Sequence, residues 1–125
     1  MNYVLDAGAL IAIDRRDRRM FGFVAAQMVA GSTFSTHGGV VAQAWRGGGR
    51  QVMLRRALGA IEVVALSRGL GQQAGALLAA SGTSDVVDAA LVCMARDGET
   101  IITSDPHDVA YLIDMAGVDV TIRHV

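Results

Sequence analysis

The sequence contains no lysine, and all 11 of its basic residues are arginine. Reactions that need a Schiff-base lysine are therefore excluded, as is a Walker-type phosphate-binding loop, whose lysine reaches the phosphates. Glutamate is almost as scarce, because only Glu62 and Glu99 occur among the 12 acidic residues. Chemistry based on aspartate remains open.

Cysteine and long apolar runs are also nearly missing. The single Cys93 excludes an intramolecular disulfide and a zinc–cysteine cluster, and we expect it to be a small buried side chain. No apolar stretch reaches the roughly 18 residues of a membrane span, and the N-terminus lacks the basic and apolar segments of a signal peptide. We therefore expect a cytosolic protein without membrane association.

The length of 125 residues, with 52% apolar residues, suits one domain over residues 1–125. Short segments that predict strands alternate with segments of helical period along the chain. This alternation predicts an α/β fold with a mostly parallel sheet covered by helices on both faces, and five strands fit. The predicted strands are 3–6, 33–36, 61–66, 100–103 and 118–125, and the predicted helices are 8–15, 18–30, 40–45, 50–58, 70–80, 84–96 and 106–115.

Aspartates stand where the predicted strands end. Asp6 follows the first strand and Asp105 the fourth, so both are expected at the edge of the sheet where ligands bind. Asp85 and Asp88 share one face of the helix that leads into the fourth strand. Two carboxylates about 4 Å apart repel by roughly 4 kcal/mol at an effective dielectric constant of 20, and a hard divalent cation removes that repulsion.

Helix capping explains some of these acids equally well. Asp85 is a plausible N-cap with Asp88 in the first turn, and Asp105 precedes Pro106, a frequent pair at a helix start. Asp108 lies one turn further along and faces either the same edge or solvent. The residues alone leave both interpretations open.

Three segments carry a family resemblance: VLDAGALI at 4–11, DAALVCMA at 88–95 and IITSD at 101–105. Together they resemble the PIN domain, and most of all the VapC toxins of bacterial toxin–antitoxin pairs. The resemblance implies a three-layer α/β/α sandwich with a five-stranded parallel sheet. It also implies Mg²⁺- or Mn²⁺-dependent endoribonuclease activity on RNA, and a small antitoxin that wraps and blocks the toxin.

By position in these motifs, Asp6, Asp88 and Asp105 match the three aspartates of the family. Thr103 matches the small hydroxyl residue two positions before the last of them. Asp85 is an additional candidate metal ligand, and Asp108 an additional candidate of the site.

The chain departs from the family pattern at Gln43, which stands where the family usually has a glutamate. Glu62 and Glu99 cannot easily replace it, because they fall at the starts of the third and fourth strands and so lie at the opposite edge of the sheet. Two hypotheses follow. Either the aspartates hold one ion while Gln43 orients water or substrate, or the domain is catalytically weakened and acts as an RNA- or antitoxin-binding module.

Substrate and partner surfaces are suggested by two further patterns. Arg46 and Arg50 flank the glycine triplet 47–49 and are candidate phosphate contacts, although charges on helices are often just a solvated face. Residues 20–28 carry more apolar surface than a domain of this size readily covers. The resemblance to VapC toxins implies that this region serves self-association and antitoxin docking, so we expect a homodimer. We also expect Ser35, Thr36 and His37, where the second strand ends, to reach the edge of the sheet where ligands bind. A zinc site is not expected, because the three histidines are scattered without ligand spacing.

Competing assignments fit less well. A Rossmann-like nucleotide binder would need a G-x-G-x-x-G sequence after the first strand, and Gly8 stands there alone. A dehalogenase-like phosphatase would want a second acid at position 8.

Overall fold

The computed structural model describes all 125 residues. The strands are β1 (Asn2–Leu5), β2 (Thr33–His37), β3 (Glu62–Val64), β4 (Thr100–Thr103) and β5 (Thr121–His124). The helices are α1 (Ala7–Asp14), α2 (Arg18–Val29), α3 (Gly38–Ala44), α4 (Val52–Ala60), α5 (Arg68–Ser81), α6 (Val86–Met94) and α7 (Pro106–Ala116). Every predicted strand and helix is present.

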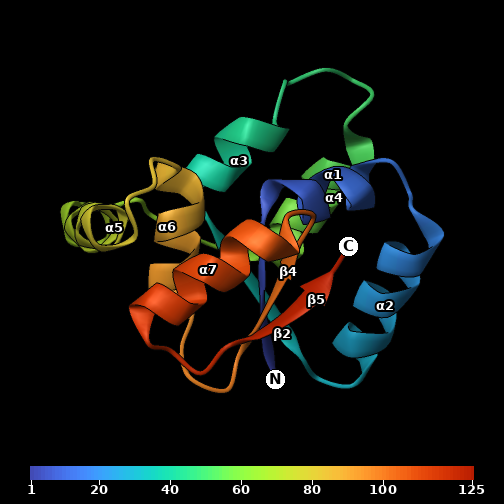
Figure 1. Cartoon of the computed structure of the whole chain (residues 1–125). Helices are drawn as coiled ribbons and strands as arrows, with labels where there is room; N and C mark the ends of the chain where they lie inside the picture. Colours follow the sequence, from blue (N-terminus) through green and yellow to red (C-terminus); the bar gives the residue numbers. More distant parts are fainter.

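The five strands form one sheet in the order β3-β2-β1-β4-β5, and every neighbouring pair is parallel. Right-handed crossovers place α1 to α4 on one face and α5 to α7 on the other, because the chain moves along the sheet in opposite directions before and after β3. Accordingly α1 packs against α2, α3 and α4, while α5, α6 and α7 pack against one another (Figure 1). The predicted three-layer α/β/α sandwich is confirmed.

The central strands are apolar because helices cover both of their faces. Val4 and Leu5 of β1, and Ile101 and Ile102 of β4, are fully buried. A parallel strand buried on both faces is expected to be a continuous apolar run rather than an alternating one. These strands therefore form a rigid base for the residues that follow them.

Several segments differ from their predicted extents; β5, for example, covers 121–124 instead of 118–125. β3 is confined to 62–64, at one edge of the sheet, where a single neighbour supports it. β2 extends one residue beyond its predicted end, to His37, and Ser35, Thr36 and His37 are all buried. Thr36 is held there because its hydroxyl donates a hydrogen bond of 2.7 Å to Leu5 O on the adjacent strand.

No single helix has the length and apolar character to cross a membrane, and only α5 and α6 taken together, across a bend of 112°, meet both conditions. Cys93 of α6 is half-buried against the core, and burial raises the pKa of its thiol.

Candidate active site

Asp6 lies at the edge of the sheet between β1 and β4, where the order in which the chain adds strands changes direction. The chain runs from β1 toward β2 on one side, and β4 arrives on the other side of β1, so the carboxyl ends of β1 and β4 flank the topological switch point. The Asp6 side chain is only 5% exposed. It accepts hydrogen bonds from the backbone N–H groups of Ala9, at 2.8 Å, and Ser104, at 3.0 Å. The same carboxylate thus caps α1 and fastens the segment after β4.

Gly8 permits this close approach of the two segments. A Cβ atom at position 8 would overlap the Ser104 side chain, so a larger residue would push the loop after β4 away from α1. The acid that would define a dehalogenase-like site therefore has no room at this position.

Asp105 projects from the same edge, directly after β4. Its backbone N–H donates to Thr103 Oγ1 at 2.8 Å, while Thr103 itself is fully buried. The Asp105 carboxylate is exposed and caps no backbone N–H of α7, although it stands at the N-cap position. The Asp105 carboxylate is therefore not used in capping, and the hydrogen bond from its own backbone N–H to Thr103 holds that backbone in place.

Asp88 reaches the edge from α6. The Asp85 carboxylate is the N-cap of that helix and accepts a hydrogen bond of 2.9 Å from the Asp88 backbone N–H, so the capping interpretation of Asp85 is correct. The neighbouring Val87 is tied to the sheet, because its carbonyl oxygen lies 2.9 Å from His37 Nε2. His37 Nδ1 accepts from Gly39 N–H at 3.1 Å, which assigns the proton to Nε2.

The electrostatic surroundings of Asp88 are entirely negative. The pKa of Asp88 is raised to about 6, first by burial and then by the nearby carboxylates of Asp85, Asp6, Asp105 and Asp108, in that order. No arginine offsets them. We call these five residues the acidic cluster.

Burial is also the main reason that the pKa of His37 is lowered, and its hydrogen bond to Val87 O counteracts only part of this effect. His37 is fully buried and neutral in the folded protein.

Part of the acidic cluster lines a hollow between α6, α7 and the loop that precedes α6. The hollow has a volume of about 260 Å³, and its lining includes Asp85, Asp88, Asp108 and Tyr111. No three His, Cys, Asp or Glu side chains lie close enough together to enclose a metal ion. The cluster is therefore an electrostatic concentration of carboxylates rather than a formed coordination sphere.

The other predicted site residues lie on α3 and the loop after it. Gln43 is exposed on α3. The Arg46 guanidinium folds back onto Ala42 O, at 3.1 Å, and Trp45 O, at 2.7 Å, so it caps the end of α3. Arg50 is exposed. Of the two predicted phosphate contacts, Arg50 is thus the freer side chain.

The chain was compared with known proteins. Neither the family models nor the curated proteins yielded a match. Among solved structures, VapBC2 from Rickettsia felis, bound to a DNA fragment from the VapBC2 promoter, matches with a TM-score of 0.65 and 13% sequence identity. The match covers 100% of this chain and 99% of that chain.

The fold is PIN-like. The chain matches the VapBC2 chain along its full length and has the parallel five-stranded sheet described above. The resemblance inferred from the three sequence segments is thereby confirmed at the level of the fold.

The PIN-like sheet also explains why neither glutamate joins the cluster. Glu62 begins β3, and Glu99 immediately precedes β4. Glu99 instead accepts hydrogen bonds of 2.7 Å from Asn2 Nδ2 and from the Arg96 backbone N–H. Both glutamates lie at the amino-terminal edge of the sheet, as the sequence predicted.

Two features near the cluster were not predicted from the sequence. His37 was expected near the edge of the sheet, but its role as the cap of α3 was not; that role could have been found from its place directly before Gly38 and Gly39, where a chain leaving a strand starts a helix. Tyr111 could have been found from its spacing, because it lies three residues after Asp108 and so shares a helix face with it.

Proposed function

We propose that this protein is a metal-dependent endoribonuclease of the PIN type, acting as the toxin of a toxin–antitoxin pair similar to VapBC. One observation carries the proposal: carboxylates from three distant segments of the chain gather near the switch point of a PIN-like sheet, and no arginine side chain offsets their charge at Asp88. Such a concentration of negative charge is unfavourable in itself and characteristic of functional sites. An RNA substrate is consistent with a cytoplasmic location.

The donors of the acidic cluster fit a hard divalent cation in chemistry and in charge, since Mg²⁺ and Mn²⁺ prefer carboxylate oxygens. Asp6, Asp88 and Asp105 would hold the ion, with Asp85 beside them, and to do so their side chains would have to move closer together than they are in the structure. The two Asp6 oxygens each accept one backbone N–H and keep lone pairs for a further ligand. When bound, the metal would supply a more acidic water and neutralise charge on a phosphodiester.

The protein groups have separate tasks in this proposal. Asp6 fixes the distance between the ends of β1 and β4, because its carboxylate spans both. Thr103 orients Asp105 through the backbone of that residue. Gln43 would orient water or substrate through its amide, because an amide cannot take up a proton as a general base.

The second candidate function is a catalytically weakened PIN domain that binds RNA or an antitoxin without efficient cleavage. The observation in its favour is Gln43, since a neutral amide oxygen is a weaker cation ligand than the carboxylate usual in the family.

The two functions are separated by assaying the purified chain on structured RNA and tRNA with Mg²⁺ or Mn²⁺. The endoribonuclease proposal expects metal-dependent cleavage that Asp6→Ala abolishes and that Asp114→Ala, an exposed acid of α7 outside the cluster, leaves intact. Cleavage by the wild type no faster than by Asp6→Ala would leave the binding module as the function.

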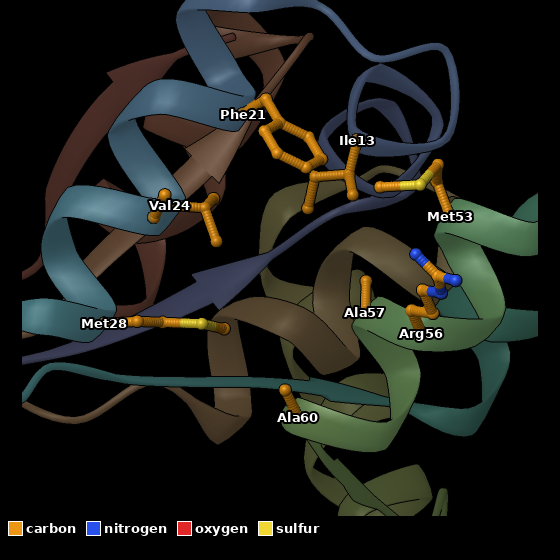
Figure 2. Close-up of a pocket in the computed structure, with 9 residues that line it drawn as sticks. Ile13, Phe21, Val24, Met28, Met53, Arg56, Ala57 and Ala60 are labelled. Carbon is orange, nitrogen blue, oxygen red and sulfur yellow. The ribbon is translucent and has the colours of Figure 1, made fainter.

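The proposed partner is an antitoxin whose amphipathic helix occupies an apolar groove between α2 and α4. The groove has a volume of about 310 Å³, and Phe21 and Met28 at its side are 41% and 38% exposed. Figure 2 shows the side chains of α2 facing those of α4 across it. Its lining consists of Ile13, Phe21, Val24, Ala25, Met28, Met53, Arg56, Ala57 and Ala60.

The charge around this groove specifies the partner further. Arg16, Arg18 and Arg56 line an adjoining hollow that shares Phe21 and Met53 with the groove. An amphipathic helix with acidic residues on its polar face would match both surfaces. The homodimer predicted from residues 20–28 would use the same apolar surface and is the competing occupant.

A further inference from the structure

The hollow beside the acidic cluster has an aromatic wall. Tyr111 lines it together with Asp85, Asp88 and Asp108, and its side chain is 45% exposed. An exposed aromatic ring beside several carboxylates is not required for packing, because Val109 and Leu112 already bury the inner face of α7. The ring thus borders the proposed reaction site without belonging to the core.

The ring is held in place at its far end. The Tyr111 hydroxyl donates a hydrogen bond of 2.8 Å to Ser81 O. Ser81 is the last residue of α5, where carbonyl oxygens lack partners within the helix. This bond satisfies one such carbonyl and ties α7 to α5. A tethered ring loses little conformational entropy when something packs against it.

The hollow offers nothing cationic to a nucleotide. Its charged residues, Asp85, Asp88 and Asp108, are all acidic, and Thr83 and Ser84 complete its polar wall. A phosphodiester entering here gains no ion pair from the hollow itself. Binding must therefore draw on contacts that do not involve phosphate charge, and stacking of a base on an aromatic ring is such a contact.

We propose that Tyr111 is a stacking platform for the nucleobase adjacent to the phosphodiester that the acidic cluster receives. The inference rests on the proposed function and deepens it, because it assigns a substrate-contacting residue and favours unpaired RNA, whose bases are free to stack. Every base has a stacking face, so the preference is for single strands rather than for a particular sequence.

The test measures binding of a 12-nucleotide single-stranded oligoadenylate, with Ca²⁺ in place of Mg²⁺ so that affinity is read apart from turnover. Tyr111→Leu, which keeps an apolar side chain without a ring, should weaken binding about tenfold, the size expected for loss of one stacked base. Tyr111→Phe, which keeps the ring and loses the hydroxyl, should bind within about twofold of wild type. Met115→Leu, at an exposed position further along α7, is the matched control.

A second probe separates stacking from a structural role. A set of oligoadenylates carries one abasic nucleotide each, at successive positions along the strand. One of them should bind wild type about tenfold more weakly than the intact oligoadenylate does. In Tyr111→Leu, no abasic position should weaken binding in this way. Equal binding by wild type and Tyr111→Leu, or equal losses in Tyr111→Phe and Tyr111→Leu, would overturn the inference while cleavage by wild type keeps the proposed function. If wild type neither binds nor cleaves RNA, the inference fails together with the proposed function.

Discussion

At the scale of single residues, the ionisation of Asp88 works against folding. The pKa of Asp88 is about 6 in the folded protein, against 3.8 for an ordinary aspartate. Between these pH values the folded protein keeps a proton that the unfolded chain has released, so stability falls as the pH rises through this window. The penalty is complete above pH 6, and solvent screening at this half-exposed group keeps it moderate.

We therefore expect Asp88→Asn, which cannot ionise, to raise the melting temperature by a few degrees at pH 7.5 and much less at pH 4. Thermal unfolding of both proteins in metal-free buffer measures this difference. Asp114→Asn removes an exposed carboxylate outside the cluster and should show no dependence of this kind. A pH-independent effect of Asp88→Asn would contradict the electrostatic interpretation.

Gln43 allows a direct test of how far the amide weakens cation binding. Gln43→Glu restores the carboxylate that the family pattern has, and we expect it to tighten Mn²⁺ binding about tenfold, because affinity grows with the charge of the ligand set. Isothermal titration calorimetry gives the affinity. Gln73→Glu adds the same charge at an exposed position of α5 and should change nothing; unchanged affinity in Gln43→Glu would place residue 43 outside the site.

At the scale of elements, His37 joins β2 and α3 to α6 and so holds Asp88 at the edge of the sheet. Asn at position 37 would still cap α3, because Asn is a favoured N-cap, but it is too short to reach Val87 O. We expect His37→Asn to lower stability by about 1–2 kcal/mol, the range for a lost buried hydrogen bond and cavity. Amide hydrogen exchange should quicken in the first turn of α6.

His37→Ala removes both the cap and the link to α6, and it provides the comparison. If the exchange rates of α6 are unchanged in both variants, His37 has no part in positioning Asp88. Protonation of the buried imidazole should also destabilise wild type as the pH falls below 6.5, because its pKa is lowered in the folded state. This contribution should be missing in His37→Asn.

The helices and strands were predictable because each has a local signal, such as the apolar run Val4–Leu5 before Asp6 or the helix start Asp105–Pro106. The last residue of β2, His37, was not predicted in the strand, because the sequence signal for a strand weakens at polar residues. The hydrogen bonds at this end of β2, from Thr36 to Leu5 O and between His37 and Val87 O, join residues that are 31 and 50 positions apart.

At the scale of the whole molecule, the groove between α2 and α4 is an apolar surface that no other element of the chain fills. We expect the product of a short reading frame directly upstream of the gene to co-purify with the chain. Phe21→Asp should abolish this association and Arg56→Glu should weaken it, because one removes apolar contact and the other reverses a charge.

Arg68→Glu, at an exposed position of α5 in the opposite helical layer, is the control for this experiment. Light scattering measures the mass of the isolated chain in solution and so shows whether a second copy of the chain, the competing occupant of the groove, is bound. If Phe21→Asp converts a dimer into a monomer and leaves co-purification intact, the groove is the contact between two copies of the chain.

The residues of the candidate site differ in how far the sequence accounts for them. The geometry of a parallel sheet was sufficient to bring Asp6 and Asp105 to one edge, whereas Asp88, on α6, was selected by its place in the family motif. That the three residues act as a functional site stays a prediction. The sequence could not reveal that the Asp105 carboxylate makes no capping hydrogen bond, or that the Arg46 guanidinium donates to carbonyl oxygens at the end of α3. These depend on rotamers and on how loops close, which no local pattern encodes.

The pairing of β1 with β4 has a consequence for the protein during its own synthesis. Asp6 is made well before the strand that lies beside it, because Val4 pairs with Ile101, 97 positions later in the chain. The central strand therefore gains its second neighbour only after the segments from β2 to α6 have all been made. A fragment that stops before β4 has neither that neighbour nor Asp105, so the acidic cluster cannot assemble in it.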